Sequence, residues 1–353
     1  MEIMEVQVSA NSTSVPGPVT ARHRLPIALL GNALMRIAGG ASGVLVGLYL
    51  ADLANQGRQV DAALVGVLGA ISFGAELLAS VPMGMLSDAI APRALMTGGA
   101  LLGAAATQLF GMSGWTSIFF LSRAIEGLSA AAGVPPLLAH ITDATEGDPA
   151  LRARTMSYFE LSLLAGLAVG GVVGAQLWRA FHTNAFAAVA SIYLLCAVLL
   201  YFGAAGSKGH GGREALAGFW RALHQPSLRH LAPVWLCVNS VVGLWLGPTL
   251  TFLLTQKVRD GQFFTGIFAD HPEHIGWLLL GYSAVFGAGI SAWSVILPRI
   301  PSIKVLRIGL VAMFVVCVGL FLLTPSVRFE FRRSYFISFA SAYLHLFPEE
   351  RTA

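Results

Sequence analysis

Nine long apolar stretches constrain the fold of this chain more than any other feature of its sequence. A helix needs roughly 20 mostly apolar residues to cross the hydrocarbon core of a bilayer. The chain is 56% hydrophobic and only 11% charged, whereas soluble domains carry about 25% charged residues. Lipid must therefore be its main solvent, and we predict an all-α, polytopic membrane helix bundle. The predicted spans are Ile27–Leu50, Ala62–Leu86, Ala94–Met112, Ser117–Thr142, Met156–Trp178, Ala185–Ala205, Leu231–Gln256, Ile275–Leu297 and Val305–Thr324.

Several classes of site and partner are not indicated. The net charge of +4 is spread over the loops, so we expect the bilayer as the main partner and no nucleic acid. The three cysteines, Cys196, Cys237 and Cys317, lie in three different spans, without metal-type or disulfide spacing. Asp270, His271, Glu273 and His274 include metal-ligand types, but Pro272 interrupts any regular helical face there. We expect a solvated loop at that point, no metal and no cofactor.

The distribution of Lys and Arg predicts the orientation. Positively charged residues are enriched in cytoplasmic loops. With the amino terminus in the cytoplasm, the outer side receives only Arg58, Arg179, Lys257 and Arg259. The inner side receives Arg22, Arg24, Arg93, Arg152, Arg154, Lys208, Arg213, Arg221, Arg229, Arg299, Lys304 and Arg307. We therefore predict an inner or plasma membrane protein with a cytoplasmic amino terminus.

The longest inner connection divides the chain. We predict a disordered cytoplasmic lead over 1–24, a six-helix bundle over 25–205 and a linker over 206–230, followed by a partial bundle of three helices over 231–324. Helically spaced apolar residues in the linker are typical of an amphipathic helix lying on the inner leaflet. A loosely ordered basic linker is the alternative.

The last segment, 325–353, has a different composition. It contains no glycine, although the preceding 324 residues hold all 39, and it is rich in Phe and Tyr. Arg328, Arg332 and Arg333 would lie on the outer side, against the charge bias. We expect this segment not to be the native continuation of the membrane fold, as after a frameshift or an early stop. Ordinary variation of a terminus is the alternative.

Three motifs occur in order along the first bundle. Between spans two and three the sequence reads Gly84-Met-Leu-Ser-Asp88-Ala-Ile-Ala-Pro-Arg93. Span four contains Arg123-Ala-Ile-Glu126-Gly127, and span five contains Gly166-Leu-Ala-Val-Gly170-Gly171-Val-Val-Gly174-Ala175. The many glycines indicate close helix packing, because small residues let backbones approach each other in lipid.

Together these motifs resemble those of the major facilitator superfamily. The first is similar to G-x-L-x-D-x-x-G-R-K, with Ala91 and Pro92 in place of the second glycine and the first base. The second is similar to R-x-x-x-G in helix four. The third is similar to G-x-x-x-G-P-x-x-G-G of antiporter-like members, with Gly171 at the proline and Ala175 at the last glycine. The resemblance implies conformational roles for Gly84, Asp88, Arg93, Gly127, Gly166, Gly170, Gly171 and Gly174.

Ionisable residues inside the predicted spans are the candidate functional residues. Each charge costs about 2.5–3.5 kcal/mol at the bilayer centre on insertion scales, so it needs a partner or a role. Arg36 and Glu76 fall at similar depth in spans one and two. We predict that they pair, either as a structural salt bridge or with Arg36 anchoring an anionic substrate group. Glu160 lies near a span end and can reach the inner surface.

Arg123 and Glu126 form the second candidate pair. They are three residues apart, so they share one face of a helix. The resemblance implies proton transfer near Arg123, with Glu126 as the group that titrates; a structural ion pair is the alternative. Pro135 and Pro136 are expected to bend this span.

These features predict a secondary transporter that moves a small solute by alternating access, and proton coupling is one option that they allow. A transporter-like sensor or adaptor, or a non-functional truncated gene product, is the alternative. Among the motifs of enzymes, we find no nucleophile elbow, phosphate-binding glycine loop or catalytic triad. We therefore predict that the protein is not an enzyme.

Overall fold

In the computed structural model, every assigned element is a helix, which confirms the all-α prediction. The described residues are 18–204, 248–257 and 266–296, with scattered positions between 304 and 318. The first six predicted spans are α1 (Pro18–Asn55), α2 (Ala62–Ala89), α3 (Pro92–Met112), α4 with α5 (Thr116–Ala131, Val134–Ala144), α6 (Pro149–Phe181) and α7 (Ala185–Gly203). The short helix η1 (His182–Asn184) joins α6 to α7. The last two described elements are α10 (Pro248–Thr255) and α11 (His274–Ile296).

Five helical stretches in the described part are long and apolar enough to cross a membrane, the last of them running through both α6 and α7. The fourth, Thr116–Ala144, contains the expected bend: α4 ends at Ala131, and α5 restarts with Pro135 and Pro136 in its first turn. Proline is tolerated there because first-turn N–H groups have no helical acceptor. Most of predicted spans seven and nine, the linker and the tail lie outside the described residues.

Two sequence-based boundaries were wrong. The predicted lead over 1–24 is too long, because α1 begins at Pro18. Pro18 is the first residue of α1, where the fixed φ of proline suits a helix. The helix therefore begins among the polar residues that precede the membrane span. The stretch from Gly84 to Asp88 was placed in a loop, but α2 continues through it to Ala89. Only Ile90 and Ala91 connect α2 to α3.

Glycines set a very close contact between α1 and α6. A Cβ at Gly40 would lie 2.2 Å from the carbonyl oxygen of Gly166, and one at Gly170 would lie 2.6 Å from that of Ile37. A Cβ at Gly174 would lie 2.7 Å from the carbonyl oxygen of Ala41. Three glycines of the span-five motif therefore face α1, where no larger residue fits.

Aromatic side chains hold together the end of the bundle at which α1 ends and α2 begins, which we call the distal end. Tyr49 of α1 makes edge contacts with Phe110 and Phe119, and lies 5.6 Å from Phe186 between ring centroids. Phe110 stacks on Phe119 at 4.5 Å. The Tyr49 hydroxyl donates a 3.0 Å hydrogen bond to the carbonyl of Ser113. Helices α1, α3, α4 and α7 are thereby fixed to one another at this end.

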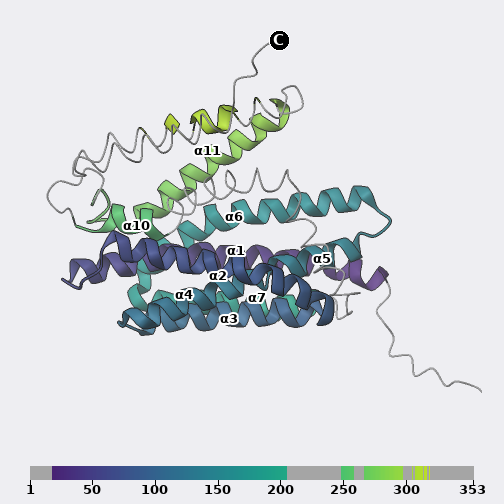
Figure 1. The fold of residues 1–353 in the computed structure, drawn as a ribbon, viewed down its shortest axis with the longest axis horizontal. Helices are drawn as coiled ribbons and strands as arrows, with labels where there is room; N and C mark the ends of the chain where they lie inside the picture. Colours follow the sequence, from purple (N-terminus) through teal and green to yellow (C-terminus); the bar gives the residue numbers. More distant parts are fainter. Residues whose placement is uncertain are drawn as a thin grey trace, which may run out of the picture.

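The second part of the chain joins the bundle at the same distal end. Helix α10 packs on α1, and α11 packs on α6. A Cβ at Gly276, near the start of α11, would lie 2.9 Å from the Cα of Val172. Added Cβ atoms at Gly281 and Gly289, farther along α11, would meet none of the described residues within 4 Å. Figure 1 shows the same arrangement: α11 starts beside α10 and runs obliquely, not parallel to the bundle.

Candidate functional site

An enclosed ion pair lies in the middle of the bundle. On α4, the Arg123 guanidinium contacts the Glu126 carboxylate through Nη1 and Oε2. Its Nε also donates a 3.5 Å hydrogen bond to the carbonyl of Leu68 on α2. Arg123 is only 4% exposed, so its charge is satisfied inside the protein. The predicted spacing of this pair is thus confirmed as a contact.

Gly127 brings α2 against this pair. A Cβ at Gly127 would lie 2.2 Å from the carbonyl oxygen of Ser72 and 2.9 Å from the backbone nitrogen of Glu76. The glycine of the helix-four motif therefore lets the backbone of α2 approach one residue after Glu126. This contact places Glu76 within electrostatic range of Glu126.

Arg36 is positioned in the same way on the other side of the site. A Cβ at Gly166 of α6 would lie 2.6 Å from the Cβ of Arg36. The close contact of α1 with the glycines of α6 therefore fixes the position of α1 at the level of Arg36. Arg36 interacts electrostatically with Glu76 and, more weakly, with Tyr193 and Glu160.

Arg36 and Glu76 interact electrostatically but do not form a contact ion pair. None of the ion pairs within 4.0 Å among the described residues includes either side chain. The prediction that Arg36 and Glu76 form a salt bridge was therefore wrong, and their helices are not close neighbours, because α1 packs mainly on α6 and α7, whereas α2 packs mainly on α4. Both side chains remain partly accessible in the middle of their helices. An accessible charge at that depth faces water or a ligand more readily than lipid.

Two polar features near Arg36 were missed by the sequence analysis. Tyr193 of α7 is 3% exposed and interacts electrostatically with Arg36, Arg123 and Glu126. Asn32, one helical turn before Arg36, donates a 2.7 Å hydrogen bond to the hydroxyl of Ser162. Neither carries a charge, so a search for intramembrane charges passes over them. A polar side chain in an otherwise apolar span was the available signal.

The first motif does not join this site. Its Arg93 lies at the opposite, proximal end, where Nε donates a 3.5 Å hydrogen bond to the carbonyl of Ala204, after the end of α7. The guanidinium carbon lies 4.9 Å from the centroid of the Tyr201 ring. A Cβ at Gly84 would make only an ordinary contact with Pro135, at 3.7 Å. Asp88 is within the helical part of α2, but its side chain lies outside what the structure describes.

The remaining candidates lie at the surface. Glu160 is exposed. In the loop before α11, His271 Nδ1 lies 3.6 Å from Glu273 Oε1, and the His271 and His274 rings are 5.3 Å apart. Within the described ranges, no three metal-binding side chains are grouped closely enough to hold an ion.

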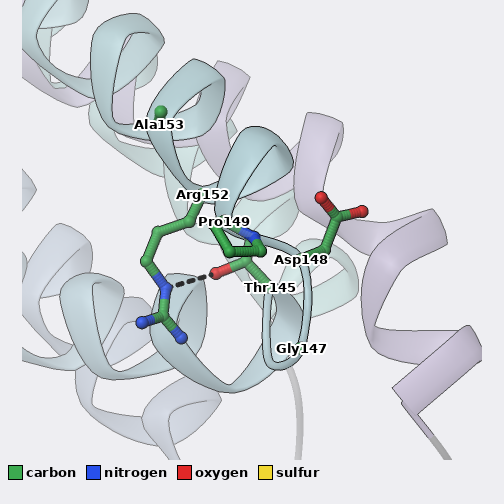
Figure 2. A pocket seen from close by; sticks show the side chains of 6 residues that line it. All are labelled: Thr145, Gly147, Asp148, Pro149, Arg152 and Ala153. Atoms are coloured by element: carbon green, nitrogen blue, oxygen red, sulfur yellow. Dashed lines mark hydrogen bonds between the residues drawn. The ribbon is translucent and has the colours of Figure 1, made fainter.

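A pocket of about 360 Å³ lies at the proximal connection from α5 to α6, and neither Arg36 nor the Arg123–Glu126 pair lines it. In Figure 2, Arg152 reaches across to Thr145, and the Asp148 carboxylate points away from them. The Arg152 Nε donates a 3.2 Å hydrogen bond to the Thr145 hydroxyl. Asp148 also caps α6 by accepting from the backbone of Leu151. These contacts tie one helix to the next, and we assign the pocket no ligand.

Enclosed charges between closely packed helices define a multi-pass membrane protein with a polar interior. Comparison with known families agrees, since the model of the Major Facilitator Superfamily matches residues 28–347. The chain belongs to this superfamily, as its three motifs predicted. The match includes residues 325–347, so it does not separate the compositionally distinct tail from the rest. No curated protein matched the chain.

A solved structure shares the fold. It is described as a bacterial homolog to the human lysosomal transporter Spinster, in an inward-facing and unoccupied conformation. The TM-score is 0.55 and the identity 15%, with 79% of this chain and 64% of that chain covered. The chain thus spans less than two thirds of that structure's length, and at this identity the likeness is one of fold alone.

Proposed function

We propose that the protein is a secondary transporter that moves a small solute carrying an anionic group, by alternating access. The observation that carries this proposal is the position of Arg36. It lies in the middle of α1, is partly accessible, and interacts electrostatically with Glu76 without a direct ion pair. A cation held in this way can exchange its interaction with Glu76 for one with a substrate anion. Glu76 then serves as the counter-ion of the empty site.

The Arg123–Glu126 pair is the proposed site of proton coupling. Intramembrane carboxylates are typical members of proton relays. Glu126 is in electrostatic range of Glu76, and Tyr193 is in range of both Arg36 and Glu126. A proton on Glu126 would therefore change the field at the proposed substrate site. The coupling ion is a proposal and rests on this proximity.

Alternating access is supported by the way α10 and α11 meet the bundle. Contacts at Gly47 and Gly276 close the distal end, whereas added Cβ atoms at Gly281 and Gly289, later on α11, would meet none of the described residues within 4 Å. With the amino terminus in the cytoplasm, as the charge bias favours, the distal end is the outer one. The arrangement is then closed outside, in keeping with the inward-facing description of the similar solved structure.

A substitution cycle tests the substrate-anchor role. We expect Arg36→Ala to lower the midpoint of thermal unfolding, because Glu76 loses its cation, and Arg36→Ala with Glu76→Ala to recover most of that loss. Wild-type protein should be stabilised by at least one member of a panel of small carboxylates and phosphates, measured as a shift in that midpoint. The double variant should fold but show no shift.

Arg154→Ala, which removes an exposed cation on α6, is the control and should keep the ligand response. A double variant that still responds like wild type would refute the anchor role. Arg36 and Glu76 would then be scaffold.

The proposed orientation has its own test. We expect a single cysteine at Gln56 to react with an impermeant thiol reagent in intact cells, and one at Glu146 to react only after the cells are opened. Both positions are exposed and lie at opposite ends of the bundle. The native cysteines are replaced by alanine in this background. The reverse labelling pattern would invert the orientation.

A further inference from the structure

The face of α1 that carries Arg36 continues towards the distal end with glycines. Gly43 and Gly47 follow Arg36 at spacings that keep all three on one side of a helix with about 3.6 residues per turn. A Cβ at Gly47 would lie 2.6 Å from the carbonyl oxygen of Pro248 in α10. This face is therefore directed at the second part of the chain rather than at lipid.

Space remains beside this face between Arg36 and α10. An added Cβ at Gly43 would meet none of the described residues within 4 Å, and one at Gly39 would meet only the hydroxyl oxygen of Tyr193 among them, at 3.5 Å. Arg36, Gly39 and Gly43 are all partly accessible. At 1.5 Å per residue, the stretch from Arg36 to Gly43 is about 10 Å long. The contact at Gly47 ends it on the distal side.

Tyr193 brings a hydrogen-bonding group to this space. Its side chain is 3% exposed, and its ring is held against α3, where a Cβ at Gly103 would lie 2.6 Å from Cε1. Among the described residues, the hydroxyl has no hydrogen-bond partner. Its oxygen is nevertheless not one of the fully enclosed unpartnered atoms, so a small molecule can reach it. A buried hydroxyl without a partner is costly, and a polar group of a bound molecule beside Gly39 would satisfy it.

The charges beside this space limit the charge of a solute. Arg123 is held by Glu126, whereas Arg36 is in none of the ion pairs within 4.0 Å among the described residues. Glu76 interacts electrostatically with Arg36 and would repel a second negative group, because like charges brought together are unfavourable. One anionic group is thus matched, and the rest of the solute should be uncharged.

We propose that Gly39, Gly43 and Tyr193 bind the uncharged body of the solute. The solute is accordingly a small monoanion whose body extends from Arg36 towards the distal end and carries a hydroxyl or another hydrogen-bonding group. This proposal deepens the proposed transport function and rests on it, because Arg36 supplies the anion site. It adds the residues that determine which anions fit.

Two acids that differ in length test the space along α1. Butyrate ends near Gly39, whereas γ-phenylbutyrate would extend to Gly43. Gly43→Leu fills this space and should weaken γ-phenylbutyrate binding by about tenfold or more, as expected for overpacking, while butyrate binding changes by less than about twofold. Binding to the full chain in detergent is measured from the shift of the unfolding midpoint with ligand concentration. Gly281→Leu, which adds the same side chain on α11, should bind both acids like wild type.

Two acids of similar size test the hydroxyl. γ-Hydroxybutyrate and pentanoate differ in a terminal hydroxyl or methyl group. The ratio of their affinities should fall by about two- to tenfold in Tyr193→Phe, the effect of one neutral hydrogen bond. The midpoint without ligand should change little, because the ring keeps its contacts with α3. Tyr158→Phe, which alters an exposed tyrosine of α6, is the control and should keep the wild-type ratio.

The outcomes separate this site from the anchor role of Arg36. A Gly43→Leu protein that binds γ-phenylbutyrate like wild type, or a Tyr193→Phe protein with an unchanged affinity ratio, would overturn the body site and leave the anchor role intact. The Tyr193 measurement stands even if Gly43→Leu does not fold. If the wild-type protein responded to none of the four acids, the anchor role on which the body site rests would itself be contradicted.

Discussion

Replacing Arg123 with alanine is expected to reduce the free energy of unfolding by about 3–5 kcal/mol, the cost of leaving one member of a buried ion pair alone. Arg123 is 4% exposed, contacts Glu126 and also donates to the backbone of Leu68. Its loss strands a carboxylate between helices and leaves the Leu68 carbonyl without this donor. The midpoint of unfolding in detergent, followed by size-exclusion fluorescence, measures the effect.

The double variant separates charge from packing. Arg123→Ala with Glu126→Ala should recover a large part of the loss, because no unpaired charge remains. Arg154→Ala removes an exposed cation on α6 and should leave the midpoint unchanged. If Arg123→Ala were as stable as wild type, Glu126 would have to be neutral or hydrated in the folded protein. The enclosed ion pair would then be the wrong description of this site.

The second large effect is expected at the α1–α6 contact. Gly40→Ala places a methyl group 2.2 Å from the Gly166 carbonyl oxygen, so the backbones must separate, at about 1–3 kcal/mol for an overpacked contact. Gly43, one turn later, has nothing within 4 Å of an added Cβ. Gly43→Ala should therefore stabilise slightly, since alanine favours helix by up to about 1 kcal/mol over glycine.

Comparing the two variants in the same detergent cancels any effect of helix propensity. Equal midpoints for Gly40→Ala and Gly43→Ala would mean that α1 and α6 are not in the described contact. The same shift of α1 would also displace Arg36, which lies one turn before Gly40. A loss of stability in Gly40→Ala alone is the expected result.

The helical fold followed from the sequence because lipid imposes a simple rule. Each crossing needs one long apolar helix, so the length of an apolar run predicts a span almost directly. The boundaries at Pro18 and Ala89 were less predictable. Polar residues beyond the membrane surface can continue a helix or leave it, and hydropathy does not distinguish the two.

The site was only partly predictable. Arg123 and Glu126 are three residues apart, so their contact is a local property of one helix. The relation of Arg36 to Glu76 depends on which helices are neighbours, and that is set by glycine contacts at Gly127 and Gly166. Sequence spacing alone could not show that α2 packs on α4 rather than on α1.

The conformational motif residues divide in a way that no motif match specifies. Gly166, Gly170 and Gly174 face α1, whereas a Cβ at Gly171 would lie 3.0 Å from Leu279 of α11. One motif thus serves two helix contacts: the α1–α6 contact inside the first bundle, and the α6–α11 contact with the second part of the chain. Only the second would have to open during alternating access.

The most direct test of alternating access is to place a large side chain in the α6–α11 contact. Leucine at Gly276 must push against Val172, so it should open the distal end and close the proximal one. Spin labels at Ala187 and Ile267 report the distal end, and labels at Arg154 and Val285 report the other. Gly281→Leu, on the same helix with open space around it, is the matched control.

We expect Gly276→Leu to lengthen the distal distance and to shorten the second distance in the same sample, while Gly281→Leu leaves both as in wild type. Opposite changes at the two ends would show α11 rocking against the bundle as one body. A distal distance that lengthens with no change at the other end would mean only local displacement of α11. That result would contradict alternating access by this chain.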